Sequence, residues 1–389
     1  MKKLAIITTH PIQYNAPLFE MLSQRGVIKI KVFYTWGEAV LHNKYDPGFK
    51  KNINWDIPLL NGYEYEFIKN ISKNPGSNHF NGIINPTLIN DIEKWGAEAI
   101  LVFGWKFRSH LKCLKYFSKK IPVFFRGDST LLDDRKINIK SILKYFILKY
   151  VYKQVDYVFF VGNENKKYYL KYGLKDSQLI FAPHAIDNNR FKEDISDTLR
   201  DDLKISKSDI IFLFAGKLEL KKNPLLLLNA FIELKNQNIH LIFVGNGELE
   251  KELKLKCTGL EKSLQKRIRF IDFQNQLKMP MVYKSADIFI LASQGPNETW
   301  GLAINEAMAS GVPVIASDKC GCSSDLIENY KNGVIFKSNN LESLKDAMIF
   351  MISQKDGKKS MGKYAQMSIA KWSFENISLA IETTMYSKL

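Results

Sequence analysis

Two glutamates are the residues of this sequence that could most plainly do chemistry together. Glu298 and Glu306 lie in the segment NETWGLAINEAMASGVPVIA, residues 297–316, with seven residues between them. The composition predicts a helix over about 302–310, because good helix formers dominate it and a glycine and a proline follow. Glu298 then lies in the preceding loop, and Glu306 lies among apolar neighbours, where a buried carboxylate needs a partner.

The start of that helix suggests what the two carboxylates could bind. Free N–H groups at a helix N-terminus suit a phosphate, whereas a carboxylate beside them would repel one. Glu298 and Glu306 therefore suit hydroxyl groups, such as those of a sugar or a ribose. The alternative interpretation is that one glutamate caps the helix and the other is solvated.

Two further groups follow predicted strands in the second half. Gly216, Lys217 and Lys222 come after IIFLFA, where a glycine allows close approach to a ligand and lysines neutralise phosphate. Gly245 begins a G-x-G turn after HLIFV that lacks the third glycine of a dinucleotide fingerprint. Ordinary turns with solvated lysines are the alternative. The segment after the first strand, TTHPIQYNAP, contains no glycine, which argues against an NAD domain there.

Polar and aromatic residues also follow strands in the first half. Arg126 and Asp128 follow PVFF, and no histidine lies nearby in the sequence. A structural salt bridge or loop cap is the alternative for this pair. His10, Gln13 and Tyr14 are expected to face the same cleft, and a structural role is the alternative for the histidine. Trp105 could stack on a sugar ring, and a core aromatic is the alternative.

The elements that position these residues alternate in type along the chain. Short apolar runs alternate with helix-like segments in both halves, which predicts an α/β fold with parallel sheets covered by helices. Two Rossmann-like domains would then face a central cleft, with ligands at the carboxyl ends of the strands. The expected boundaries are 1–185, a linker over 186–208, a second domain over 209–370, and a C-terminal helix over 371–389 that packs toward the first domain.

Composition limits the class of protein. The chain has 389 residues, a net charge of +16 and 46% hydrophobic residues, so it can form cores and favours anionic partners. Only four cysteines are present, which fits a reducing cytoplasm, and the CGC at 320–322 has no matching metal ligands nearby. The N-terminal apolar run LAII is too short for a signal peptide, and no run is long enough to span a membrane. We therefore expect a cytoplasmic protein.

One predicted helix is both basic and apolar. SILKYFILKYVYKQV, residues 141–155, carries Lys144, Lys149 and Lys153 among large apolar side chains. It could lie on an anionic membrane surface, as a peripheral contact on the inner face. The alternative is a helix that covers the sheet with its lysines outward.

Taken together, these residues resemble the retaining glycosyltransferases of the GT-B fold, glycosyltransferase family four (group 1). The resemblance covers nearly the whole chain and is strongest over 210–336. Lys217 stands where the family has arginine, and the first domain lacks the family's glycine-rich loop and its histidine. The matching positions are Gly216, Lys217, Leu218, Lys222, Gly245, Gly247, Ala286, Asp287, Glu298 and Glu306.

The resemblance implies a role for each site residue. Glu306 would bind the ribose hydroxyls and Glu298 the donor sugar, while Lys217 and Lys222 would hold the diphosphate. Glu298 is also expected to act in catalysis. Arg126 and Asp128 stand where the family has its histidine, so they could share in catalysis, Arg126 by contacting the donor and Asp128 by orienting the acceptor hydroxyl. The other donor-binding residues implied are Gly216, Gly245, and, through backbone groups, Thr299, Trp300, Gly301 and Leu302.

The implied activity is transfer of a sugar from a nucleoside-diphosphate sugar to a hydroxyl of a glycan or lipid-linked saccharide. The nucleotide-sugar is a substrate, and no cofactor or bound metal is expected. The expected pathway is bacterial surface polysaccharide, either lipopolysaccharide or capsule. An epimerase or phosphorylase of the same fold remains an alternative. Nucleic-acid binding would also suit the charge, but the sequence shows none of the known motifs.

Overall fold

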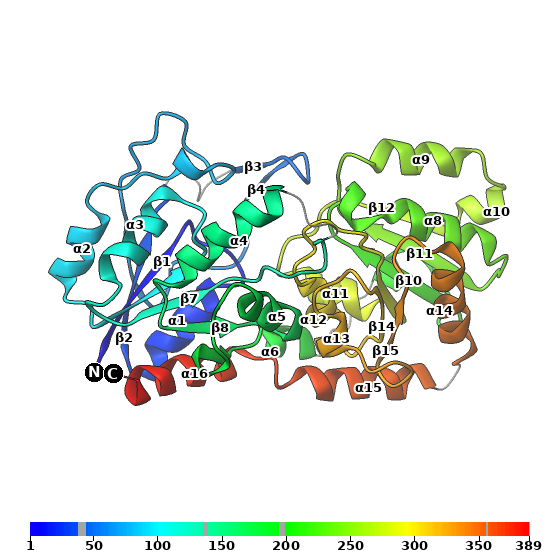
Figure 1. Cartoon of the computed structure of the whole chain (residues 1–389). Helices are drawn as coiled ribbons and strands as arrows, with labels where there is room; N and C mark the ends of the chain where they lie inside the picture. Colours follow the sequence, from blue (N-terminus) through cyan, green and yellow to red (C-terminus); the bar gives the residue numbers. More distant parts are fainter. Residues whose placement is uncertain (38–43, 135–138, 194–198, 355–356, 389) are drawn as a thin grey trace. The chain divides into compact units, whose positions relative to one another are not determined.

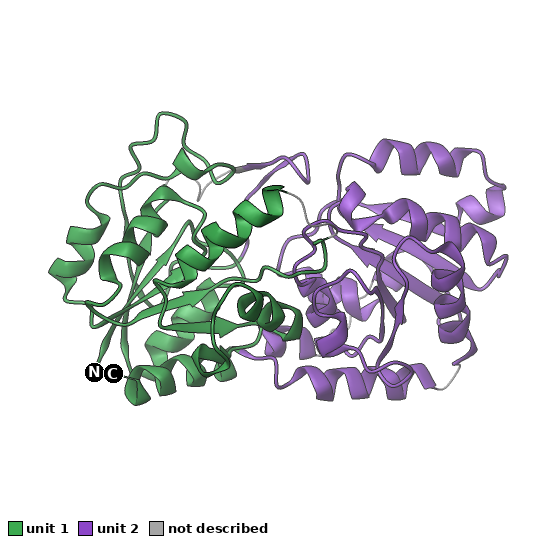
Figure 2. Ribbon diagram, viewed as in Figure 1, with its two compact units in different colours: residues 1–44, 57–184, 374–389 green, residues 45–56, 185–373 purple. Residues whose placement is uncertain are grey.

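The computed structural model divides the chain into two compact units, shown in Figure 2. The residues it describes are 1–37, 44–134, 139–193, 199–354 and 357–388. Unit 1 comprises Met1–Lys44, Ile57–His184 and Phe374–Leu389. Unit 2 comprises Tyr45–Asp56 and Ala185–Ser373.

Unit 1 is built on a seven-stranded sheet in which every named pair of strands is parallel (Figure 1). Its strands are nearly continuous apolar runs, as expected where helices cover both faces. In sheet order they are β5 (Glu64–Phe67), β2 (Lys29–Tyr34), β1 (Lys3–Thr8), β6 (Ala99–Phe103), β7 (Val123–Arg126), β8 (Tyr157–Phe160) and β9 (Leu179–Phe181). Its helices are α1 (Ala16–Arg25), α2 (Leu88–Trp95), α3 (Arg108–Phe117), α4 (Ile139–Tyr152), α5 (Asn163–Lys171) and α16 (Phe374–Ser387).

Unit 2 repeats this plan with a six-stranded parallel sheet. In sheet order its strands are β12 (Ile268–Ile271), β11 (Ile239–Val244), β10 (Ile210–Ala215), β13 (Ile288–Leu291), β14 (Val314–Ser317) and β15 (Gly333–Phe336). Its helices are α6 (Asn188–Lys192), α7 (Leu199–Asp202), α8 (Pro224–Glu233), α9 (Glu250–Thr258), α10 (Lys262–Gln265), α11 (Met279–Lys284), α12 (Leu302–Ala309), α13 (Ser323–Leu326), α14 (Leu341–Ser353) and α15 (Gly357–Ile369). The predicted α/β class with two Rossmann-like halves is therefore confirmed.

Each of the two large sheets has one point where the strand order reverses. In unit 1, β1 lies between β2 and β6, and in unit 2, β10 lies between β11 and β13. The loops that follow the two adjacent strands run apart at such a point, which leaves room for a ligand at their carboxyl ends. The candidate residues after β1 and β6, and those after β10 and β13, thus lie at the switch points of their own units.

The segment before residue 57 departs from the expected domain boundaries. The short strands β3 (Lys44–Asp46) and β4 (Lys51–Ile53) pair with each other, and Tyr45–Asp56 clusters with unit 2. The ring of Phe49 meets that of Phe273 edge-on at 4.8 Å, and Lys51 forms an ion pair with Asp272. These contacts join residues more than two hundred positions apart, so strand patterns in the sequence do not reveal them.

The expected linker and terminal helix also have defined places. Within 186–208, residues 194–198 lie outside the described part, and the rest belongs to unit 2. The terminal helix α16 belongs to unit 1 and lies beside α1 (Figure 1). Arg25 donates to both carboxylate oxygens of Glu382, at 2.8 and 2.7 Å. Among the described helices, none is long and apolar enough to span a bilayer.

Candidate functional site

A buried ion pair occupies the carboxyl edge of the unit 2 sheet. Glu298 Oε2 accepts from Lys222 Nζ at 2.8 Å and from Ser293 Oγ at 3.0 Å. The Glu298 side chain is 8% exposed and that of Lys222 is 14% exposed. The pair thus joins the loop after β10 to the loop after β13, across the switch point.

Both members of the pair are held in their charged forms. Burial alone would raise the pKa of Glu298, but Lys222, Lys221 and the Ser293 hydroxyl lower it below its usual range. Burial alone would lower the pKa of Lys222, but Glu298 raises it overall. A buried pair of full charges at a sheet edge is expensive to desolvate, so it is a candidate for function.

Lys217 is paired as well, with the segment that precedes residue 57. Its ammonium lies 2.9 Å from Asp46 Oδ1 and 5.1 Å from the centre of the Phe49 ring. Burial opposes ionisation of Asp46, but Lys217 and the backbone N–H groups of Gly48 and Phe49 lower its pKa overall. The charge expected to meet a phosphate is here compensated by a carboxylate of the β3–β4 segment.

Glycines allow the loops after β10 and β11 to pack together. Gly216 has φ +150° and Gly245 has φ +126°, in a region that disfavours other residues. A Cβ on Gly245 would lie 2.2 Å from the Gly216 carbonyl oxygen. Gly216 N also donates to the carbonyl of Val244 at 2.9 Å. The G-x-G turn therefore has a packing role that the sequence pattern alone does not specify.

The loop before α12 is anchored by a buried tryptophan. Trp300 is 3% exposed, and its indole donates to Asn305 Oδ1 at 2.9 Å. Its ring centre lies 5.2 Å from that of Trp372. Gly301 precedes α12 with φ +103°, and Thr299 and Leu302 on either side are half-buried. The Trp300 side chain is thus held within the protein interior, where it fixes the course of the loop.

The CGC turn, considered above only as a weak metal motif, supports this loop. Gly321 N donates to the carbonyl of Glu298, and Cys322 N donates to that of Trp300, both at 3.1 Å. A Cβ on Gly321 would lie 1.7 Å from the Thr299 carbonyl oxygen, so only glycine fits. Cys320 and Cys322 are buried free thiols. Within the described residues, no His, Cys, Asp or Glu cluster could hold a metal.

Glu306 lies inside the unit, on α12. It is 3% exposed, and its Oε2 accepts from the hydroxyl of Tyr283 on α11 at 2.7 Å. The sequence predicted that this buried carboxylate needs a partner, and the structure shows that a tyrosine hydroxyl is one. The sequence did not indicate Tyr283 as a site residue, because no pattern in the sequence shows that α11 packs against α12.

Arg126, expected to act in catalysis, is bound to backbone. Its two terminal nitrogens donate to the carbonyls of Ala182 and Pro183, both at 2.8 Å, and the residue is 5% exposed. Burial lowers the pKa of its guanidinium to about 10, which leaves it charged at neutral pH. This geometry gives Arg126 a positioning role, since it holds the turn that follows β9.

That turn supplies a histidine that the sequence order conceals. His184 Nε2 lies 3.9 Å from Asp128 Oδ2, and burial lowers the histidine pKa despite the carboxylate. The expectation that no histidine lies near Asp128 holds along the sequence but is wrong in space. The sequence signal that could have found His184 is the segment PHA, which follows the strand LIF at the end of the first series of strands and helices.

The remaining candidates of unit 1 lie where the chain leaves β1 and β6. His10, Gln13 and Tyr14 lie between β1 and α1, and each is half-buried. His10 Nδ1 is 3.0 Å from the Thr9 hydroxyl, and its ring meets that of Trp36 edge-on at 5.2 Å. Trp105 follows β6 and packs partly against the core of unit 1.

Comparison with known proteins finds sequence similarity that lies mainly in unit 2. Residues 195–368 match the family model described as Glycosyl transferases group 1. The chain is 27% identical over 212 residues to a lipopolysaccharide 1,2-N-acetylglucosaminetransferase of Salmonella typhimurium, covering 52% of this chain and 55% of that protein. It is 29% identical over 163 residues to spore coat protein SA of Bacillus subtilis, covering 40% and 43%. The chain spans about half the length of the curated relatives it matches.

Solved structures extend the likeness to the whole fold. Anabaena Alr3699/HepE in complex with UDP superposes with a TM-score of 0.75 at 18% identity, over 100% of both chains. At that identity the match concerns the fold alone. The chain is therefore similar in sequence to group 1 glycosyl transferases over residues 195–368, and similar in fold to the solved structure over its whole length.

Proposed function

We propose that this chain is a retaining glycosyltransferase that uses a nucleoside-diphosphate sugar as donor. The observation that carries the proposal is the charged pair Lys222–Glu298 at the unit 2 switch point, beside the N-terminus of α12. The first turn of α12 contains no acidic residue, which leaves its N–H groups and dipole suited to an anion. Sequence family, cationic side chains and helix terminus all favour the same class of ligand.

Each group has a role that follows from its chemistry. Lys217, Lys222 and the α12 N-terminus bind the diphosphate, which requires Lys217 to exchange Asp46 for a phosphate oxygen. Glu306 accepts from the ribose hydroxyls, with Tyr283 fixing its carboxylate. Glu298 accepts from a hydroxyl of the donor sugar.

The reaction breaks the bond between the anomeric carbon and a phosphate oxygen. The electron pair leaves with the nucleoside diphosphate, whose growing charge Lys222 stabilises. The acceptor oxygen bonds to the same face of the anomeric carbon, and its proton passes to the departing phosphate oxygen. Asp128 and His184 orient the acceptor hydroxyl, Arg126 holds their loop in place, and the acceptor-side residues are His10, Gln13, Tyr14 and Trp105.

The acceptor belongs, in this proposal, to bacterial surface polysaccharide. One relative is named as a lipopolysaccharide sugar transferase, which supports this class of acceptor. The helix α4 carries lysines beside exposed apolar side chains, which suits a peripheral position on an anionic membrane surface at the cytoplasmic side.

Substitution at Glu306 tests the proposal. We expect Glu306→Ala to lose donor turnover by at least tenfold, because the ribose loses its acceptor while Tyr283 loses its partner. Tyr283→Phe is the matched control, since it removes the same internal hydrogen bond but keeps the carboxylate. The readout is transfer from a nucleotide-sugar, with the anomeric configuration of the product determined by NMR. Equal turnover in Glu306→Ala and wild type would refute the site, and an inverted product would refute the retaining mechanism.

A further inference from the structure

A cavity of about 570 Å³ lies within unit 1, between α4 and the carboxyl ends of β6 and β7. This volume lies within the range of about 300–1,000 Å³ that small-molecule sites occupy. The cavity lies next to the proposed acceptor residues, since Trp105 and Asp128 both line it. Its apolar walls come chiefly from Trp105, Phe125, Leu143, Ile147, Leu148 and Tyr152.

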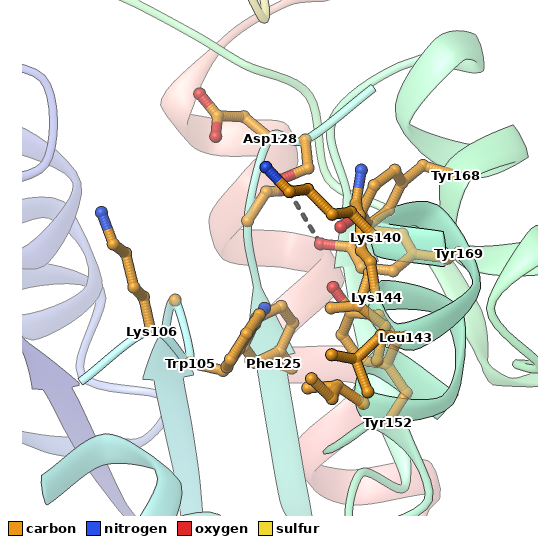
Figure 3. Close-up of a pocket in the computed structure, with 15 residues that line it drawn as sticks. Trp105, Lys106, Phe125, Asp128, Lys140, Leu143, Lys144, Tyr152, Tyr168 and Tyr169 are labelled. Carbon is orange, nitrogen blue, oxygen red and sulfur yellow. Dashed lines mark hydrogen bonds between the residues drawn. The ribbon is translucent and has the colours of Figure 1, made fainter. Parts of the chain in front are cut away.

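The cavity has one charged end and one apolar end. Figure 3 shows the charged groups of Lys106, Lys140 and Asp128 at one end, with the rings of Trp105 and Phe125 toward the other. Two ammonium groups at this end suit a phosphate, whereas the Asp128 carboxylate suits a hydroxyl. The site therefore fits a ligand that has an anionic head and an apolar body.

The polar groups around the apolar end already have partners. The Tyr169 hydroxyl donates to the Gly127 carbonyl at 2.9 Å, and Lys144 Nζ donates to Asp134 at 3.1 Å. None of the described lining side chains has a buried nitrogen or oxygen without a hydrogen-bond partner. An occupant of this end needs no hydrogen bonds, which favours a hydrocarbon over a saccharide.

The wall of the cavity also forms the outer surface of the unit. Leu143 and Ile147 line the cavity, yet they are 60% and 43% exposed. Further exposed apolar side chains and lysines lie along the same helix, and they are Ile139, Ile142, Phe146, Tyr150, Lys140, Lys144 and Lys149. An exposed apolar face flanked by lysines complements an anionic lipid surface, so a chain in the cavity can come from such a surface.

We propose that this cavity binds one hydrocarbon chain of a phosphate-bearing lipid. The chain lies among Trp105, Phe125 and Ile147, and the phosphate lies at Lys106 and Lys140. Taken with the proposed function, on which this part rests, the bound lipid is the carrier of the acceptor, and the cavity brings its head toward Asp128.

Alkyl phosphates test the cavity directly. Titration of the full chain with monomeric butyl, octyl and dodecyl phosphate should show tighter binding with each added methylene, on the order of fourfold per buried group. Inorganic phosphate should bind far more weakly. Affinity independent of chain length, or stronger binding of phenyl phosphate than of octyl phosphate, would overturn the proposal.

Two neighbouring residues of α4 provide matched variants. Ile147→Trp fills the cavity and should weaken dodecyl phosphate binding at least tenfold. Phe146→Trp places the same indole on the same helix, but Phe146, 63% exposed, does not line the cavity, so binding should be unchanged. If Ile147→Trp does not fold, Leu143→Trp repeats the test at a more exposed lining position. Equal losses in the lining and control variants would show that the chain binds the outer surface, and the cavity would be rejected.

The same proteins separate this proposal from the proposed function. Nucleotide binding concerns unit 2, and none of these variants lies there. Binding of dodecyl phosphate without stabilisation by any nucleotide would refute the glycosyltransferase but leave the cavity site. Stabilisation by a nucleotide, with alkyl phosphate affinity that does not depend on chain length, would refute the cavity site but leave the glycosyltransferase.

Discussion

At the scale of single residues, the central feature is the ion pair between Lys222 and Glu298. A buried pair often contributes little net stability, because both charges must be desolvated. Its retention at a sheet edge, where the Ser293 hydroxyl also donates to Glu298, fits a site where a ligand will exchange for one partner. A diphosphate would take Lys222 and release Glu298 for a sugar hydroxyl.

Removal of Lys222 should therefore be costly in two ways. Lys222→Ala leaves Glu298 buried without its cation, so we expect a loss of about 3 kcal/mol in the free energy of unfolding and a loss of nucleotide affinity. Chemical denaturation and nucleotide titration measure the two effects. Lys221→Ala is the comparison, because Lys221 also lowers the pKa of Glu298 but forms its own ion pair, 3.5 Å from Glu219, in a more exposed position. Similar effects of both substitutions would argue against a special role for Lys222.

Asp46 competes with the ligand that Lys217 is proposed to bind. Asp46→Asn removes that competition, so nucleotide-sugar affinity should rise, by up to about fivefold for a pair worth at most about 1 kcal/mol. Isothermal titration calorimetry measures the change. Asp272→Asn breaks the Lys51 pair of the same segment without touching Lys217, and it should leave affinity unchanged. Weaker binding to Asp46→Asn would show that Asp46 contributes to the donor site instead.

At the scale of elements, the strands could be predicted from the sequence, but the contacts between the loops and helices that follow them could not. Apolar runs such as IIFLFA and DIFILA specify buried parallel strands, and the structure contains them as β10 and β13. Glu298 and Lys222 could be predicted from loops that follow strands, and Glu306 from the helix that follows one of these loops. Their contacts with Ser293 and Tyr283 depend on how loops and helices pack, which has no periodic pattern in the sequence.

The CGC turn shows the same limit at a single loop. Gly321 must be glycine, because a Cβ at this position would lie 1.7 Å from the carbonyl oxygen of Thr299. Gly321→Ala should displace residues 298–301 and abolish nucleotide stabilisation, with a loss of about 1–3 kcal/mol in folding free energy. Gly259→Ala is the control, because its Cβ would meet nothing closer than 4.0 Å and its φ is −82°. Normal nucleotide stabilisation of Gly321→Ala would show that this turn does not support the loop.

At the scale of the whole molecule, the chain forms two units from interleaved segments. Tyr45–Asp56 belongs to unit 2 and Phe374–Leu389 to unit 1, so neither unit is a continuous stretch of sequence. Patterns of strands and helices identify two βα series but not these exchanges, which depend on contacts such as Phe49 with Phe273 and Arg25 with Glu382. His184 likewise reaches Asp128 only because β9 closes the unit 1 sheet.

The most direct measurement is thermal unfolding of the full chain with UDP, GDP, ADP, CMP and TDP and their sugars. A ligand that binds only the folded state raises the melting temperature. At a concentration of one hundred times its Kd, such a ligand adds about 2.7 kcal/mol to the free energy of unfolding. We predict that one nucleoside diphosphate and its sugar stabilise the wild type, and that Glu306→Ala loses this effect. No stabilisation by any member of the panel would contradict the nucleotide-sugar site, and stabilisation that persists in Glu306→Ala would place the nucleotide elsewhere.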